Sequence, residues 1–496
     1  MRLAFSCASA CRASCALVTA LFVSACTVGP DYERPPAPTP AVFKELKGWK
    51  QATPRDEITR GAWWSVYRDP ELDRLVSQVE INNQTVAAAL ASFEQAVALT
   101  RESQASLFPG VNAAYTWTRA GQGANFGSSG HATAATNFYP QATVTWTIDV
   151  WGKIRRQIES NVAVAQTDSA LYENAKLSAQ AQLAIAYFNL RAQDSLKVLL
   201  ERTIKVYKET LKITQNQYNG GTVSKADLIT AETQVLSTQA QAIQADVLRA
   251  QYEHAIAALI GRPPAELTIA PSALPHTPPG VPVALPSALL ERRPDIAAAE
   301  RAMQEQNALI GVAVAAYYPQ ITFSASGGFE GKSMLPLLAA NEIWSIGASA
   351  VDPLFDGGLR AAQVDAAKAI YRQAVANYRQ TTLTAFQQVE DELAALRVLG
   401  RELKVQEKAR DAAAEAVKVY LNQYRAGTVA FTSVVVAEAT LLIDEEAVLA
   451  TRQNLFVANV TLIEALGGGY DATSLETVTA PPLIEAIARS SPVPPL

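Results

Sequence analysis

The chain has 496 residues, of which 49% are hydrophobic and 18% are charged, and its formal net charge is −5. The mild negative charge and the lack of any basic run argue against a protein that binds nucleic acid. His131, His254 and His276 lie far apart in the sequence, and no Cys/His spacing of a metal site occurs. We therefore expect no structural metal and no cofactor.

The first 25 residues are predicted to form a secretory signal peptide. Arg2 and Arg12 supply positive charge, and an apolar core ends in small residues at Ala25. This core is too short to span a bilayer. Because three of the four cysteines lie inside this removable segment, the exported chain would keep only Cys26 and could form no internal disulfide.

Cys26 directly follows Val23-Ser24-Ala25, and this stretch resembles a bacterial lipobox. The resemblance implies cleavage before Cys26 and acylation of the new N-terminus, although Val23 stands where leucine is commoner. The alternative is a plain signal peptide followed by an incidental cysteine. Each buried methylene contributes about 0.8 kcal/mol, so several acyl chains would anchor the protein firmly.

The rest of the chain is predicted to contain two copies of one unit. The stretch NQYNGGTV beginning at Asn216 reads against NQYRAGTV beginning at Asn422, an offset of 206 residues. Proline is too dense in 261–286 for a helix interior, so this segment is predicted to link the copies. The expected divisions are a signal peptide 1–25, a lipidated extension 26–70, repeat one 71–260, the linker 261–286, repeat two 287–469 and a periplasmic tail 470–496.

Each copy is expected to run helix, strand, loop, strand, long helix, tight turn, helix. Between Leu359 and Tyr424 apolar residues recur at sums of three and four, as in coiled coils, although the core of a soluble bundle would give the same stripe. An unbroken helix over Ile154–Tyr218 would reach roughly 100 Å. Glycines fit the helix ends and Ser224–Asp227 fits a capping box, which predicts two long helical hairpins.

Four segments alternate between apolar and polar residues over about nine or ten positions each, the length of a tilted membrane strand. They are 111–118, 142–150, 321–330 and 344–350. A half-buried soluble sheet would alternate in the same way, but the adjoining loops, expected at 119–139 and 331–342, offer no apolar cover. After the signal no run of about 18 apolar residues occurs, so a membrane would have to be crossed by strands. Four strands are too few for a closed barrel, which predicts oligomerisation.

The sequence resembles the TolC-like outer-membrane factors, in particular the lipoprotein branch that serves resistance-nodulation-division efflux systems. The motifs that carry the resemblance follow the family's order and span nearly the whole chain. They are Cys26-Thr27-Val28-Gly29-Pro30-Asp31-Tyr32, Trp63-Trp64, Asp69-Pro70-Glu71-Leu72, Arg293-Pro294-Asp295-Ile296, Ala299-Glu300-Arg301 and Phe355-Asp356-Gly357-Gly358.

The resemblance implies a mainly α-helical protein with a membrane β part. Three chains would form a twelve-stranded β-barrel continued by a long α-helical coiled-coil barrel through the periplasm. It also implies a lipid-anchored location in the outer membrane of a Gram-negative bacterium, with a periplasmic adaptor (membrane-fusion) protein and an inner-membrane pump as partners. The expected function is a passive exit duct for small molecules such as drugs.

Other functions fit the sequence less well than this duct. Gly121-Gln122-Gly123 is the nearest approach to a nucleotide-binding loop, but no helix follows it, and we expect no catalytic residues and no enzyme. A conduit for type I protein secretion is the alternative within the channel class. A non-conducting periplasmic tether would explain Cys26 and the helices but would leave the four strands without a role.

A gate is expected at the periplasmic tips, where turns contain Gly221 and Gly427. Related channels often carry acidic residues just after the second turn, whereas Ser433 and Val436 occupy the matching positions here. The offset of 206 residues places Asp227 at the position of Ser433 in the first copy. Asp227 is expected either to cap its helix or to line the pore.

Overall fold

The computed structural model describes most of the chain between residues 27 and 479. The predicted signal peptide, Cys26 and most of the predicted tail lie outside the described residues. The described residues are 27–37, 39–40, 42–46, 62–122, 133–281, 292–333, 341–470, 475 and 477–479.

Two halves of the chain repeat the order helix, strand, strand, long helix, shorter helix. The first half also begins with a short helix and is preceded by two 3₁₀ turns, η1 (Lys44–Leu46) and η2 (Trp63–Tyr67). Its elements are α2 (Pro70–Asn82), α3 (Gln84–Ala105), β1 (Gly110–Gln122), β2 (Thr133–Ile148), α4 (Lys153–Asn219) and α5 (Lys225–Leu259). After η3 (Pro264–Glu266), the second half comprises α7 (Pro294–Ala315), β3 (Gln320–Phe329), β4 (Glu342–Val351), α8 (Leu359–Arg425) and α9 (Phe431–Ala465).

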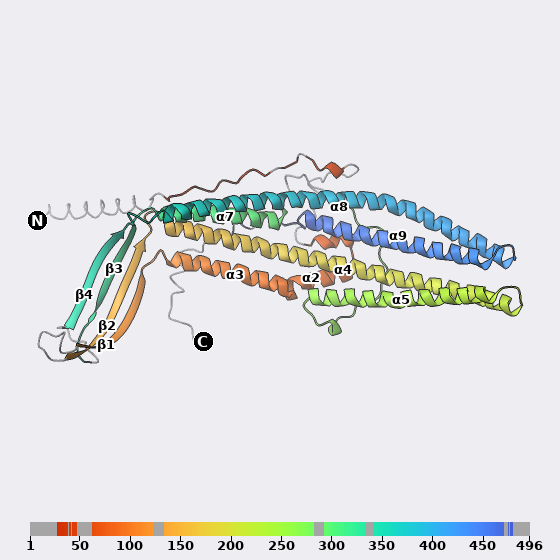
Figure 1. The fold of residues 1–496 in the computed structure, drawn as a ribbon, viewed down its shortest axis with the longest axis horizontal. Coiled ribbons are helices and arrows are strands. Elements are labelled where there is room, and N and C mark those ends of the chain that lie inside the picture. Colours follow the sequence, from red (N-terminus) through yellow and green to blue (C-terminus); the bar gives the residue numbers. More distant parts are fainter. Residues whose placement is uncertain are drawn as a thin grey trace, which may run out of the picture.

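The molecule is elongated, with the strands at one end and the turns of two helical hairpins at the other (Figure 1). The long helices α4 and α8 have 67 residues each, which corresponds to roughly 100 Å at 1.5 Å per residue. The shorter helices α5 and α9 have 35 residues each and return alongside them. The predicted pair of long helical hairpins is therefore confirmed. Among the described residues, no helix is at once long and apolar enough to pass through a membrane.

The main hydrophobic core lies about midway along α4 and α8, where both hairpins, α2 and η2 meet. Trp63 is 1% exposed and donates from Nε1 to Gln180 Oε1 at 3.2 Å. Asp69 caps α2 through Oδ1, while its Oδ2 accepts a hydrogen bond from Tyr187 at 2.6 Å. Most of the apolar stripe expected on α8 is buried here, including Tyr378 and Leu393. The core thus fastens the first hairpin to the second.

The four strands form one antiparallel sheet in the order β1-β2-β3-β4. The expected loop over 119–139 is wrong in extent, because β1 continues to Gln122 and β2 already begins at Thr133. Ladder pairs such as Arg119 with Thr136 extend the hairpin. The Gly, Ser and Asn content of this stretch suggested a loop, but hydrogen bonding between the two chain segments outweighs that weak local preference.

Each long helix starts at the sheet through the same device. Asp149 accepts hydrogen bonds from the backbone N–H of Ile154 and Arg155 at 3.0 and 2.9 Å. At the start of α8, Asp356 accepts from the Arg360 side chain at 2.6 Å. The residue before each helix is a glycine with a positive φ, which is 80° at Gly152 and 91° at Gly358, a conformation that other residues rarely adopt.

Candidate channel surfaces: the sheet and the helical tips

The sheet has one apolar and one polar face, and the ladder register aligns each kind across the strands. On one face, Val111 pairs with Val144, Val144 with Ala325, and Ala325 with Ile346. On the other face, Thr143 pairs with Ser326, and Ser326 shares a 2.8 Å hydrogen bond with Ser345. The alternation seen in the sequence is therefore a property of the whole sheet, as in strands that separate lipid from water.

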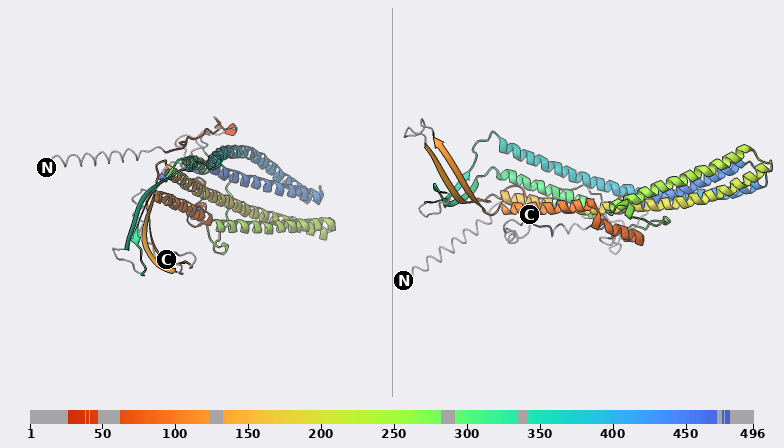
Figure 2. Two further views of the ribbon diagram at one scale, coloured as in Figure 1. Left: turned by 60° about the vertical axis from the view of Figure 1, so that its left-hand side comes forward. Right: turned by 90° about the horizontal axis from the view of Figure 1, so that it is seen from below.

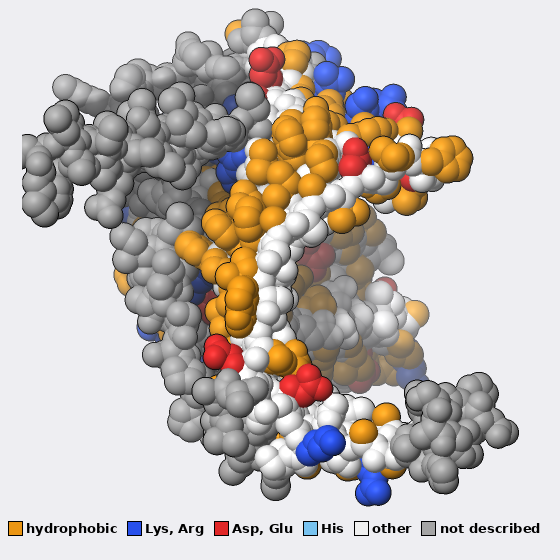
Figure 3. Space-filling view, turned by 90° about the vertical axis from the view of Figure 1, so that its left-hand side faces the viewer, with side chains coloured by type: hydrophobic (Ala, Val, Ile, Leu, Met, Phe, Trp, Pro, Cys, Tyr) orange, Lys and Arg blue, Asp and Glu red, His pale blue; other side chains and the backbone are white. Residues whose placement is uncertain are grey.

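No described helix covers either face of the sheet (Figures 1 and 2). Seen from this end of the molecule, hydrophobic side chains gather in a band (Figure 3). Large apolar side chains of the strands are exposed, among them Val111 (70%), Trp344 (73%) and Ile346 (77%). An exposed apolar surface of this kind marks contact with lipid or with another chain.

Both edges of the sheet are open within the chain, because β1 and β4 each pair with a single neighbour. An open edge leaves backbone N–H and C=O groups without partners, and such edges are not tolerated in lipid. The sheet is therefore a segment that another β-edge has to complete.

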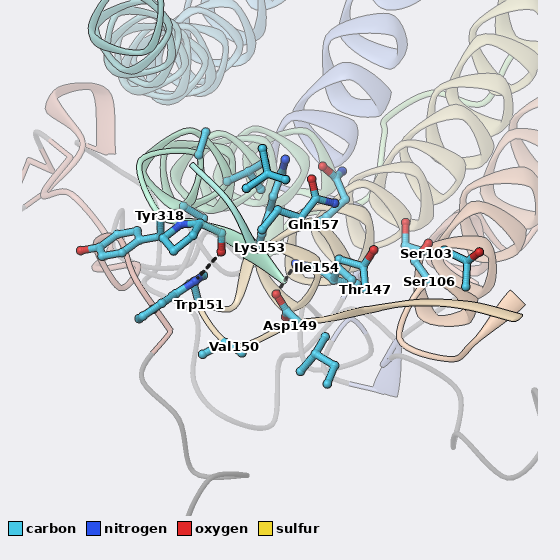
Figure 4. Close-up of a pocket in the computed structure, with 18 of the residues that line it drawn as sticks. Ser103, Ser106, Thr147, Asp149, Val150, Trp151, Lys153, Ile154, Gln157 and Tyr318 are labelled. Carbon is cyan, nitrogen blue, oxygen red and sulfur yellow. Dashed lines mark hydrogen bonds between the residues drawn. The ribbon is translucent and has the colours of Figure 1, made fainter. Parts of the chain in front are cut away.

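A cavity lined by both apolar and polar side chains lies where the sheet meets the helices (Figure 4). Its volume is about 560 Å³, and α3, β2, α4, α7 and β3 contribute to its wall. Thr147 of the polar face and Lys153 at the start of α4 line it. Trp151 stacks on Tyr318 with ring centroids 4.8 Å apart and donates from Nε1 to the Pro319 carbonyl at 2.9 Å. Tryptophan and tyrosine collect where membrane strands emerge from lipid, so this junction has the character of a membrane boundary.

The opposite end of the molecule consists of two nearly identical turns. Gly221 has a φ of 70° and Gly427 a φ of 72°. In both turns a threonine closes the helix end, since Thr222 and Thr428 each donate from Oγ1 to a carbonyl five residues earlier at 2.9 Å. The left-handed glycine and these bonds make a tight helix C-terminus, as the sequence predicted.

The candidate gate residues occupy different environments. Asp227 forms the predicted capping box, in which its carboxylate accepts from the Ser224 backbone at 3.1 Å and the Ser224 hydroxyl accepts from the Asp227 backbone at 3.2 Å. Ser433 lies half-buried in the first turn of α9, and Val436 is 66% exposed. The structure thus brings Asp227 into a helix cap and leaves Val436 on an open surface of the tip.

A small apolar cluster fastens the two tips to each other. Tyr424 of α8 packs on Phe431 of α9 with centroids 5.4 Å apart, and Val434 and Ala231 of α5 complete the cluster. The Tyr424 hydroxyl also lies 3.4 Å from Thr214 Oγ1 on α4. The contacts between the tips therefore come from both repeats.

Sequence reasoning missed a buried acid close to this cluster. Glu438 of α9 is 3% exposed and accepts a hydrogen bond from Thr210 Oγ1 of α4 at 3.0 Å. Burial raises the pKa of Glu438 to about 7, although the hydrogen bond from Thr210 lowers it. A single carboxylate within the run Val434-Val435-Val436-Ala437-Glu438-Ala439 was the signal available in the sequence. Among the described residues, no group of three or more His, Cys, Asp or Glu side chains is arranged to hold a metal ion.

The chain matches the family described as Outer membrane efflux protein twice, over residues 75–262 and 285–468. It is 28% identical to the toluene efflux pump outer membrane protein TtgC of Pseudomonas putida, over 91% of this chain and 94% of that protein. It is 30% identical to nodulation protein T of Rhizobium leguminosarum bv. viciae, over 92% of this chain and 93% of that protein.

Among solved structures, the outer-membrane channel OprN superposes with a TM-score of 0.83 at 28% identity, over 90% of this chain and 99% of that one. The fold and the expected function of an outer-membrane efflux channel, both predicted from the sequence, are confirmed by these similarities. With two matches that together span most of its length, the chain belongs to the outer membrane efflux protein family.

Proposed function

We propose that three copies of this chain close into one channel through the outer membrane and the periplasm. The observation that carries this proposal is the uncovered amphipathic sheet with two open edges, joined directly to helices of roughly 100 Å. If β1 of one copy pairs with β4 of the next, three copies give twelve strands and leave no open edge. The apolar rows then face lipid and the Thr and Ser rows face a water-filled lumen.

The proposed channel conducts small molecules out of the cell as part of a larger pump. Similarity to a toluene efflux pump protein supports small apolar compounds as cargo. A passive duct supplies neither energy nor selection, so an inner-membrane pump and a periplasmic adaptor are the proposed partners. The helical tips, which lie farthest from the sheet, are the proposed place of contact with them (Figure 1).

We also propose that acyl chains on Cys26 hold the N-terminus at the same membrane. The described chain supports this arrangement, because Val28 donates its backbone N–H to the Trp151 carbonyl at 3.1 Å. Trp151 belongs to the junction that has the character of a membrane boundary. A lipid on Cys26, two residues before Val28, would then start at the level of the bilayer surface.

The proposed gate is the ring of hairpin tips, with Gly221 and Gly427 at the turns. Asp227 shapes the first turn as a cap, and Ser433 and Val436 line the narrowing on the second hairpin. A channel between periplasm and exterior has to be shut at rest, and apolar constrictions close pores by excluding water. The exposed Val436 is suited to that role.

Two adjacent residues of β4 provide the test of the proposed membrane barrel. Ile346 lies in the apolar row and Ser345 in the polar row, so Ile346→Arg would place a charge in lipid and Ser345→Arg a charge in the lumen. An arginine on the lipid face near the bilayer midplane costs about 2–4 kcal/mol. We expect Ile346→Arg to abolish heat-resistant trimers in outer-membrane fractions and Ser345→Arg to retain them. Equal assembly of both variants would contradict the proposal.

Cargo is tested separately in a strain that lacks the gene. The wild-type chain should restore efflux of a fluorescent dye such as ethidium and resistance to toluene. Restoration of protein secretion without any change in dye efflux would instead support the secretion conduit.

A further inference from the structure

We propose that Glu438 is a proton-operated switch between the two helical hairpins. When it carries a proton, α9 packs against α4 below the tip, and when it loses the proton this packing loosens and the channel opens more readily. The effect on conduction rests on the proposed function of the tips as a gate, whereas the effect on packing concerns one chain alone.

The geometry suits the protonated acid and opposes the carboxylate. Glu438 Oε1 accepts the one hydrogen bond from Thr210, and among the described residues Oε2 is buried without any hydrogen-bond partner. Burying a charge with a single hydrogen bond is costly, whereas a neutral carboxyl group tolerates the same place. The pKa of about 7 has burial as its main cause and agrees with this reading of the contacts.

Beside Glu438 lies a cavity of about 120 Å³ between α4, α8 and α9. The titratable groups on its wall are Arg202 and Tyr207 of α4 and Glu445 of α9, while α8 contributes Val417. Arg202 is already paired with Glu445 at 2.5 Å. Burial, with a smaller contribution from Glu438, raises the pKa of Tyr207 to about 12, so its phenol stays neutral. A carboxylate at Glu438 would therefore need water molecules as hydrogen-bond partners, and the cavity between α4, α8 and α9 has room for a few of them.

The position of Glu438 connects the contact between α4 and α9 to the tip. Thr210 and Thr214 lie one turn apart on α4 and face Glu438 of α9 and Tyr424 of α8. Tyr424 in turn packs on Phe431, two helical turns before Glu438. Separating α4 from α9 at Glu438 would therefore weaken the packing of the apolar cluster that joins the tips.

The first repeat contains the same residue type without the same environment. Glu232 of α5 stands 206 positions before Glu438 and is exposed. The difference arises because α9 packs on α4 within the chain, whereas no described helix of the same chain covers Glu232. Glu232→Gln therefore removes a carboxylate of the same type without touching the contact between α4 and α9, and serves as the control.

The direction of the pH effect follows from the raised pKa of Glu438 in the packed form. The packed form holds the proton with a pKa of about 7, whereas the ordinary value is 4.5. Packing is therefore strongest in acid, weakens as the pH rises from about 4.5 to about 7, and stays constant above that. The equilibrium between packed and loosened forms changes by up to about tenfold per pH unit in this window.

The test records single channels of the full-length protein in planar bilayers from pH 5 to pH 8. The wild type should open more often as the pH rises, and Glu438→Gln, which mimics the protonated acid, should stay at the low acid level throughout. Glu232→Gln should behave as the wild type. Thr210→Val removes the bond that favours the carboxylate and should move the midpoint to higher pH. An unchanged pH profile for Glu438→Gln would overturn the proposal, as would an identical flattening by Glu232→Gln.

Hydrogen–deuterium exchange of α9 in detergent, corrected for the intrinsic effect of pH, separates this inference from the channel function. Faster exchange of the wild type at pH 8 than at pH 5, lost in Glu438→Gln, supports the switch even if no conductance is found. Exchange that does not depend on Glu438 overturns it, even in a conducting channel.

Discussion

Gly29 and Gly311 meet backbone to backbone, so that a Cβ atom added to Gly29 would lie 2.4 Å from the Gly311 Cα atom. Gly29 also has a φ of 100°, which favours glycine. Beside this contact, the buried Arg156 donates from Nη2 to Asp31 at 2.7 Å and from Nε to the Val28 carbonyl at 3.3 Å. The segment that follows Cys26 is thereby seated on α4 and α7 at the junction of sheet and helices.

Gly29→Ala should unseat this segment, because both the backbone angle and the contact with Gly311 oppose a side chain. We expect a loss of about 2 kcal/mol in the free energy of unfolding. Gly357→Ala is the control, since Gly357 also has a positive φ, of 64°, but a Cβ added there would meet nothing within 4 Å. Thermal unfolding in detergent measures the loss of stability of both variants. Equal losses would contradict the expectation that Gly29→Ala is the more destabilising change.

Asp194 joins the first hairpin to the linker that follows it. Its side chain is 3% exposed and accepts hydrogen bonds from Arg249 Nε at 2.7 Å and from the Ser272 backbone at 3.0 Å. Asp194→Ala removes the buried carboxylate that pairs with both Arg191 and Arg249, which keep carbonyl acceptors at Ala270 and Ile269, and should cost about 3–5 kcal/mol of stability. Asp246→Ala, which breaks an exposed pair with Lys197, should cost at most about 1 kcal/mol. Denaturant unfolding of both variants measures the difference.

Val436→Asp tests the gate. A carboxylate in place of the exposed valine should hydrate the constriction and raise resting conductance in planar bilayers. Asp227→Ala should instead loosen only the first turn, by about 1 kcal/mol at most, because it removes a helix cap. Unchanged conductance of Val436→Asp, together with a large loss of cation selectivity in Asp227→Ala, would place the gate on the first hairpin.

Cys26→Ser tests the anchor. If Cys26 carries acyl chains, the variant should lose metabolic labelling with palmitate, while the wild-type chain is labelled. Only part of the outer-membrane localisation should be lost, since the strands would still hold the protein in the bilayer. Labelling that persists in the variant would exclude Cys26 as the site.

Periodicity and repetition predicted the hairpins, the four strands and the turns, because these follow from local pattern. The alternation around Trp146 and the glycines near 220 and 427 are signals of this kind. Thr133, in contrast, joins a strand only because the opposite segment offers ladder partners. The burial of Glu438 depends on how one hairpin leans on the other, and the same offset in the sequence leads to the exposed Glu232. Packing between repeats is a property of the folded molecule that no short window of sequence contains.

The equal lengths of the paired helices, 67 residues in α4 and α8 and 35 in α5 and α9, limit how this protein can evolve. Removing seven residues from α4 alone would shift every later contact with the helices that pack on it, among them α5 and α9, and would leave its turn short of the turn that ends α8. The same deletion taken from all four helices would keep the coiled-coil phase, since seven residues are close to two turns. The length of the helical part is therefore expected to change in matched heptads.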